Sequence, residues 1–82
     1  MEEGKAEGII EAILFAAGRE VRINELMSAL ELSSDEIINA VAQLSLKYEK
    51  EDRGLEIIKV EDAYQLCTKK EYYEYIYPVF DK

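Results

Sequence analysis

The chain has 82 residues, of which 49% are apolar and 34% are charged, so its composition is that of one small globular domain and excludes a disordered segment. Its 18 acidic and 10 scattered basic residues give a net charge of −8, which argues against DNA or anionic membrane as a partner, since both require clustered Lys and Arg. The longest apolar run, residues 12–17, is too short to span a bilayer. A single cysteine, Cys67, permits no intrachain disulfide and fits a reducing compartment, so we expect a cytoplasmic protein.

The first predicted element is a helix over residues 6–17. Its apolar residues recur at helical spacing, and Gly18 follows where a left-handed C-cap glycine is common. Most of these apolar side chains share one wide face, but Phe15 lies on the flank of Glu11. Two interpretations are open: a central core helix, or a core helix with an additional protein-contact face around Phe15.

A short extended link over residues 19–23 leads to a second predicted helix over residues 24–30. Ser33 and Glu36 then form the Ser-x-x-Glu pattern of a capping box, which predicts the start of a third helix that runs to about Tyr48. Two helices joined by a tight turn are typical of a helix-turn-helix, in which the second helix usually lies in the major groove of DNA.

A β-hairpin is predicted from residues 55–60 and 64–68, which are rich in β-branched and aromatic side chains and flank a short turn. Its apolar residues fall on both faces, so one face can pack on the helices while the other, with Ile58 and Val60, needs a separate cover. Three helices, a two-stranded wing and a C-terminal helix together give a winged helix-turn-helix. We therefore predict a mostly helical α+β fold, with residues 1–82 forming one domain.

A final helix is predicted in the last segment, KEYYEYIYPVFDK, and should end at or before Tyr77 because Pro78 cannot donate a backbone hydrogen bond. Four of the six residues 72–77 are tyrosines, a residue type enriched at protein interfaces. Two interpretations are open: a lid on the domain's own core, or part of a protein-binding surface. The second predicts an interface made by the surplus apolar side chains, which are Phe15, Ile58, Val60, Tyr72, Tyr73 and Ile76.

Histidine and cysteine, which supply the commonest acid–base group and the commonest zinc ligands, are scarce. The sequence has no histidine, one cysteine and four widely spaced glycines, so it offers neither a zinc site nor a phosphate-binding loop. The acidic residues Glu49, Glu51 and Asp52 lie on a charged helix exit, where such side chains are solvated. We predict that the protein is not an enzyme and has no catalytic, cofactor, metal or small-molecule site.

A DNA-binding winged-helix transcription regulator is the alternative function. Asn39 and Gln43 occupy outward positions of the third helix and could pair with adenine edges in the major groove. Asp35 and Glu36 in its first turn would repel the phosphates that set the register of such contacts. The residues therefore favour a protein partner, and an isologous homodimer is the commonest such arrangement.

Three blocks, within residues 11–26, 53–56 and 64–68, resemble the N-terminal part of the segregation and condensation protein B family. The family pattern is EALLFA-G-PV-I-EL, followed by RGLEL and YQL-T around the wing. One departure is Arg22, where a helix-capping Ser or Thr is more usual. The matching residues are Glu11, Ala12, Leu14, Phe15, Gly18, Val21, Leu26, Arg53, Gly54, Leu55, Glu56, Tyr64, Gln65, Leu66 and Thr68.

This resemblance implies a non-catalytic accessory subunit of the bacterial SMC condensin, which acts in chromosome condensation and segregation. In the family, a homodimer binds the kleisin subunit, segregation and condensation protein A (ScpA), and through it the SMC ATPase. The resemblance also implies that residues 1–82 are the N-terminal domain of a longer two-domain protein, cytoplasmic and associated with the nucleoid through the complex. The residues leave open which surface forms the dimer and whether the kleisin contacts this domain.

Overall fold

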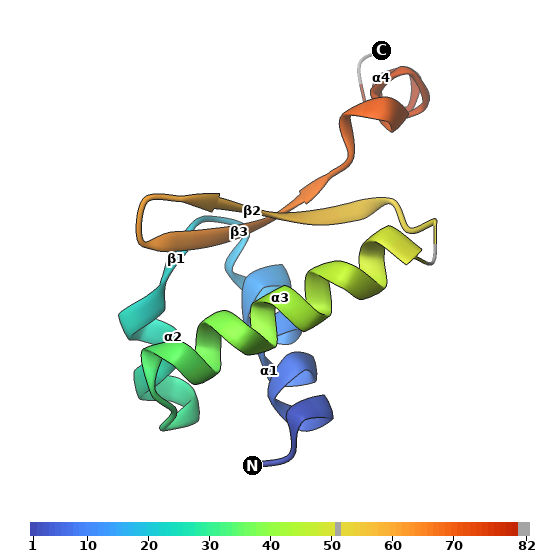
Figure 1. Ribbon diagram of the computed structural model, residues 1–82. Coiled ribbons are helices and arrows are strands. Elements are labelled where there is room, and N and C mark those ends of the chain that lie inside the picture. Colours follow the sequence, from blue (N-terminus) through green and yellow to red (C-terminus); the bar gives the residue numbers. More distant parts are fainter. Residues whose placement is uncertain (51, 81–82) are drawn as a thin grey trace.

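The computed structural model describes residues 1–50 and 52–80, which form a winged helix with a projecting C-terminal helix (Figure 1). The predicted mostly helical α+β fold is confirmed. The elements, in chain order, are α1 (Glu3–Ala17), β1 (Val21–Arg22), α2 (Ile23–Leu30), α3 (Ser34–Lys50), β2 (Leu55–Val60), β3 (Ala63–Thr68), the 3-10 helix η1 (Lys70–Tyr72) and α4 (Tyr73–Phe80).

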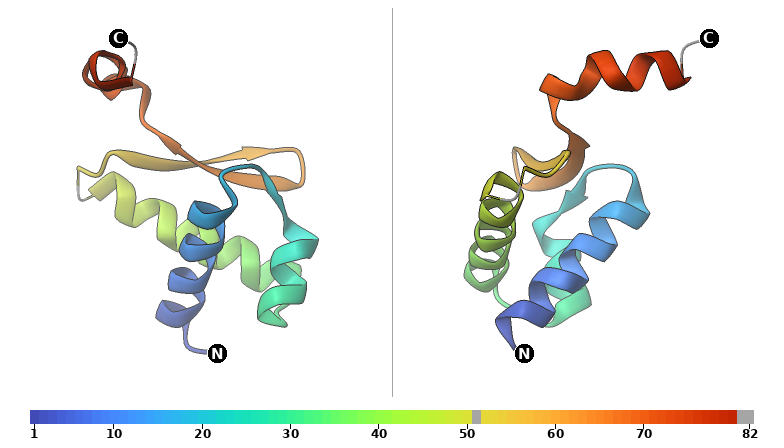
Figure 2. Two further views of the ribbon diagram at one scale, coloured as in Figure 1. Left: turned by 180° about the vertical axis from the view of Figure 1, so that it is seen from behind. Right: turned by 90° about the vertical axis from the view of Figure 1, so that its right-hand side faces the viewer.

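The three strands form an antiparallel sheet in the order β1-β3-β2. Ile57 pairs with Leu66 and Ile58 pairs with Gln65, and side chains alternate between the two faces of a strand. The inner face packs on the helices, as Figure 2 shows from behind and from the side. We call the opposite side the outer sheet face; it carries Glu56, Ile58, Val60, Gln65 and Cys67.

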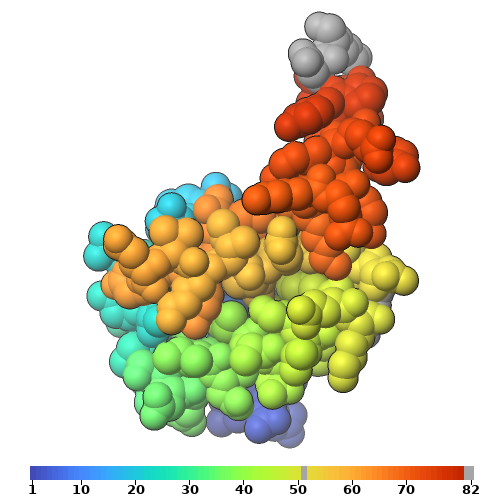
Figure 3. Space-filling model, turned by 45° about the horizontal axis from the view of Figure 1, so that its top comes forward, coloured from blue at the N-terminus to red at the C-terminus, as the bar shows by residue number. Residues whose placement is uncertain are grey.

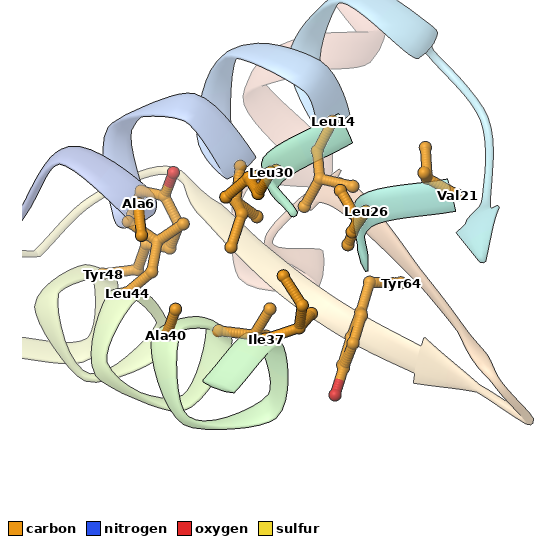
Figure 4. Packing of buried hydrophobic residues seen from close by; sticks show 12 residues of the cluster. Ala6, Leu14, Val21, Leu26, Leu30, Ile37, Ala40, Leu44, Tyr48 and Tyr64 are labelled. Carbon is orange, nitrogen blue, oxygen red and sulfur yellow. The ribbon is translucent and has the colours of Figure 1, made fainter. Parts of the chain in front are cut away.

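The hydrophobic core lies between α1, α2, α3 and the inner face of the sheet. Figure 4 shows side chains from these helices and from β3 converging there. Four large side chains are fully buried, namely Ile10, Leu14, Leu26 and Ile37. Since burying one such side chain contributes about 1.5–3 kcal/mol, this cluster is the main source of the domain's stability.

Local signals set the helix ends much as the sequence predicts. Gly18 adopts a left-handed conformation at φ 61° and its N–H donates to the Leu14 carbonyl. At the start of α3, the Ser33 N–H donates to Glu36 Oε1 at 3.0 Å, and the Glu36 N–H donates to Ser33 Oγ at 3.2 Å. The hydrogen bond from the Ser33 backbone N–H, followed by one from the Ser33 side chain, lowers the pKa of the Glu36 carboxyl. The predicted capping box is confirmed.

Arg22, the departure from the family pattern, occupies the N-cap of α2. Its guanidinium has no acceptor atom, so it cannot take the place of a capping hydroxyl. Glu25 still supplies the reciprocal half of a capping box, because the Arg22 backbone N–H donates to Glu25 Oε2 at 2.8 Å. The pKa of Glu25 is lowered, first by this bond and then by a hydrogen bond from Arg19.

Two expectations about the C-terminal segment are wrong. The helix does not end at Tyr77 but continues to Phe80 with Pro78 inside it. Pro78 removes one backbone hydrogen bond, to the carbonyl of Glu74, and Glu74 is exposed, so water can replace that bond. The segment is also no lid on the core, because none of the eight described residues of α4 is buried and the helix projects from the body (Figures 1 and 2).

Candidate protein interface

Five of the six expected interface residues lie along the path from the wing to α4. Ile58 and Val60 are exposed on the outer sheet face, the former to 37%. Tyr72 is half-buried in η1 and lines an open hollow together with Ile58. Tyr73 and Ile76 follow on α4, which stands out from the wing in Figure 3. We call the set Ile58, Val60, Tyr72, Tyr73 and Ile76 the elbow surface.

The base of α4 is held in a defined orientation by Lys69. The Lys69 backbone N–H donates to the Gly54 carbonyl at 2.8 Å, and its ammonium donates to the Tyr48 carbonyl at 3.1 Å. The ring of Tyr72 also lies close to Gly54. These contacts join the end of β3 to the exit of α3, so they fix the direction in which α4 leaves the domain.

Helix α4 presents apolar side chains around most of its circumference. On a helical wheel, only Glu74 and Pro78 interrupt them. The rings of Tyr73 and Tyr77 contact each other with centroids 5.9 Å apart. Four further residues of this helix are exposed but were not among the expected interface residues, namely Tyr75, Tyr77, Val79 and Phe80. Val79 and Phe80 lie beyond the expected end of the helix at Tyr77.

Phe15 lies apart from the elbow surface. It is 75% exposed on α1 and lines a separate open hollow with Ala12, Leu55 and Leu66. Leu55 and Leu66 belong to the inner face of the sheet, opposite to Ile58 and Val60. The six expected residues therefore do not come together. We call Ala12, Phe15, Leu55 and Leu66 the flank surface.

Two polar contacts join α1 to α3 beneath the wing. The Lys47 ammonium lies 2.7 Å from Glu7 Oε1, and the Tyr48 hydroxyl donates to Glu11 Oε2 at 2.5 Å. Burial raises the pKa of Tyr48, and the hydrogen bond and charge of Glu11 raise it further. The two acids are one helical turn apart on α1, so the pairs fix how α1 crosses α3.

The helix that would enter DNA carries the wrong charges for that role. Its first turn contains Asp35 and Glu36, and the outward residues Asn39 and Gln43 are exposed. Lys47, farther along the same helix, is paired with Glu7. This pairing reduces the positive charge available for phosphate contacts, which supply most non-specific affinity.

The acidic side chains and Cys67 are the groups that metal or redox chemistry would require. Over residues 1–50 and 52–80, no group of three His, Cys, Asp or Glu side chains is placed to hold a metal ion. Glu49 and Asp52 of the acidic cluster are exposed, while Glu51 lies outside the described residues. Burial, followed by the charge of Glu56, raises the pKa of the Cys67 thiol, which disfavours the reactive thiolate.

Within residues 1–50 and 52–80, no helix has the length and apolar character needed to cross a membrane.

Residues 8–82 match the family model described as segregation and condensation complex subunit ScpB. The chain belongs to the ScpB family. It is 40% identical over 76 residues to segregation and condensation protein B of Lachnoclostridium phytofermentans, covering 93% of this chain and 40% of the relative. It is 43% identical over 75 residues to segregation and condensation protein B of Clostridioides difficile, covering 89% of this chain and 42% of the relative. The chain thus spans about 40% of the length of these curated ScpB relatives.

Solved ScpB structures share its fold. A crystal structure of a dimer of the ScpB N-terminal domain complexed with ScpA peptide matches with a TM-score of 0.87 and 30% identity, covering 93% of this chain and 95% of that chain. ScpB from Mycobacterium tuberculosis matches with a TM-score of 0.89 at 14% identity, covering 96% of this chain and 49% of that chain. The second similarity concerns the fold alone.

Proposed function

We propose that this ScpB-family chain is a non-catalytic protein-binding module of a bacterial SMC condensin, which homodimerises and binds the kleisin ScpA in chromosome condensation and segregation. The observation that carries the proposal is a pair of separate apolar surfaces on a domain of net charge −8. The similar N-terminal domain solved as a dimer with ScpA peptide supports it, because two simultaneous partners need two surfaces.

The elbow surface is the proposed site of the second copy. A standard interface buries about 800 Å² per partner, and a terminal helix rich in tyrosine offers much of that area. The elbow surface also continues onto the exposed apolar residues of α4. We assign Ile58, Val60, Tyr72, Tyr73 and Ile76 to dimer contact.

The flank surface is the proposed site of the kleisin. Phe15 and Ala12 from α1, with Leu55 and Leu66 from the wing, line a small open hollow suited to an apolar side chain of a bound segment. Glu11 lies at the same hollow and can face a basic residue of that segment. Phe15 is thus assigned to partner binding and not to the dimer.

Residues 1–82 would then correspond to the N-terminal winged-helix domain of a longer two-domain protein. The similar N-terminal domain structure, of which this chain covers 95%, supports this assignment. The module would work in the cytoplasm and reach the nucleoid through ScpA and the SMC ATPase.

Isothermal titration calorimetry of the chain with ScpA from the same organism tests the kleisin contact. We expect saturable binding that Phe15→Asp weakens at least about tenfold, because the substitution places a charge in an apolar hollow. Ile38→Asp is the matched control, since Ile38 is an exposed apolar residue of α3 outside both surfaces. Absence of binding by the unmodified chain would refute the kleisin proposal, while equal binding by Phe15→Asp would refute only the flank assignment.

A further inference from the structure

None of the described residues of helix α4 is fully buried, although its composition is that of a buried helix. A helix that is apolar around most of its circumference is normally covered on more than one side. Isolated helices shorter than about 12–15 residues are marginal in water. With eight residues, an internal Pro78 and no buried residue among those described, α4 depends on a surface that the rest of the chain does not provide.

The outer sheet face also carries apolar side chains that no other part of the described chain covers. Ile58 and Val60 remain exposed there, beside the half-buried Gln65 and Cys67. Six residues of β2 extend about 20 Å, whereas an eight-residue helix is about 12 Å long. A helix of the length of α4 therefore fits across this face.

The two apolar features cannot satisfy each other within one chain. The contacts of Lys69 with Gly54 and Tyr48 fix the base of α4, and the helix points away from the sheet from which it emerges (Figures 1 and 2). A second copy related by a two-fold axis removes this obstacle, because each copy presents one helix and one sheet face.

We infer that two copies exchange their C-terminal helices, so that α4 of each protomer lies across the outer sheet face of the other. This inference rests on the proposed homodimer and specifies its architecture. The helix contributes Tyr73, Ile76, Tyr77 and Phe80, and the sheet contributes Ile58 and Val60. The flank surface with Phe15 stays outside the exchange and remains available to the kleisin.

Area and charge both favour a second copy as the occupant. Since each aromatic side chain offers about 150–250 Å², the exposed aromatic residues of the proposed helix face, Tyr73, Tyr77 and Phe80, present about 350 Å². Ile58 and Val60 of the sheet face add to this area, against the ~800 Å² per partner of a standard interface. Among the eight residues of α4, Glu74 is the only charged one, and on a helical wheel it lies at the edge of the face formed by Tyr73, Ile76, Tyr77 and Phe80. The side chains proposed to meet are therefore uncharged, so the contact buries no unpaired charge. The similar domain solved as a dimer covers the same part of the fold.

Complementation between two variants tests the exchange by sedimentation equilibrium of the 82-residue chain. Ile58→Asp damages the sheet face, and Phe80→Asp damages the helix, so each variant alone loses both helix–sheet contacts. We expect each to raise the dimer dissociation constant at least about tenfold. An equimolar mixture should recover dimer, because the heterodimer keeps one intact helix on one intact sheet face.

Matched controls replace the same residue types elsewhere. Ile38→Asp, at 42% exposure on α3, and Phe15→Asp should leave the dimer unchanged. Circular dichroism checks folding, and Val60→Asp replaces Ile58→Asp as the sheet variant if the latter fails to fold.

The possible failures are distinguishable. Two weakened variants that do not complement each other would overturn the exchange in favour of a helix–helix or sheet–sheet contact. A dimer dissociation constant that neither variant changed would overturn the exchange but not the homodimer. If Phe80→Asp abolished ScpA binding but not the dimer, α4 would belong to the kleisin site. An unmodified chain that stayed monomeric would overturn the homodimer itself and the exchange with it.

Discussion

The ammonium of Lys47 on α3 lies 2.7 Å from the carboxylate of Glu7 on α1. The Glu7 side chain is only 9% exposed, whereas that of Lys47 is 59% exposed. The contact has the geometry of an ion pair and not of an aligned hydrogen bond. It contributes to the packing of α1 on α3, and it also offsets a positive charge on the helix that would otherwise face DNA.

Replacing Lys47 with methionine should lower the free energy of unfolding by about 1–2 kcal/mol. Breaking a fully buried pair costs about 3–5 kcal/mol because it leaves an unpaired charge, and the exposure of Lys47 reduces this cost. Urea denaturation measures the change. The double variant Glu7→Gln/Lys47→Met should lose less free energy of unfolding than Lys47→Met alone. An equal or larger loss in the double variant would mean that the two residues do not stabilise each other.

Tyr48 should make stability depend on alkaline pH. Folding raises its pKa through burial and through Glu11, so the contribution of the neutral phenol is complete below about pH 10 and is lost as pH rises through the folded-state value. Tyr48→Phe should cost about 1–2 kcal/mol at pH 7, since it removes a hydrogen bond to a carboxylate. The free energy of unfolding of Tyr48→Phe should fall less steeply above pH 10 than that of the unmodified chain. Part of the fall should remain in the variant, because burial also raises the pKa of Tyr64. Urea titrations between pH 7 and pH 11 that gave parallel curves for both proteins would contradict this assignment.

The capping hydroxyl of Ser33 offers a local test of the fold. Ser33→Ala should lower the free energy of unfolding by about 1 kcal/mol, because it removes the acceptor for the Glu36 N–H at the start of α3. Ser34→Ala is a matched control one residue inside the helix. Thermal denaturation that ranked the two variants equally would show that the hydroxyl has no capping role.

DNA binding should be absent even at low salt. The first turn of α3 is acidic, and Lys47 is paired with Glu7. Fluorescence anisotropy with duplex DNA should therefore show no binding at low salt, where counterion release is most favourable. Affinity that fell steeply with added salt would instead support the transcription-regulator alternative, with Asn39 and Gln43 as its base-reading residues.

Elements with a strong local signal were predictable from the sequence. Gly18 ends α1 as expected, Ser33 and Glu36 open α3, and β2 has the predicted bounds Leu55–Val60. In each case neighbouring residues supply the hydrogen bonds or the side-chain pattern that sets the element. The winged-helix order follows from such signals in succession.

The direction of α4 could not be predicted, because tertiary contacts set it. Lys69 donates hydrogen bonds to the carbonyl oxygens of Gly54 and Tyr48, which are 15 and 21 residues away in the sequence. No local sequence pattern predicts those partners. The rule that proline ends a helix also failed at Pro78, where a single exposed hydrogen bond is lost. For the interface, alternation along β2 revealed that Ile58 and Val60 share a face, but it could not reveal that Phe15 belongs to another surface.

Sedimentation equilibrium of the unmodified chain shows whether this winged helix serves protein association. From about 1 to 100 μM, we predict a mass that rises to that of two chains, with a dissociation constant in or below the low micromolar range. Higher salt should strengthen the dimer, because each chain carries a net charge of −8. A single-chain mass at every concentration would contradict the account.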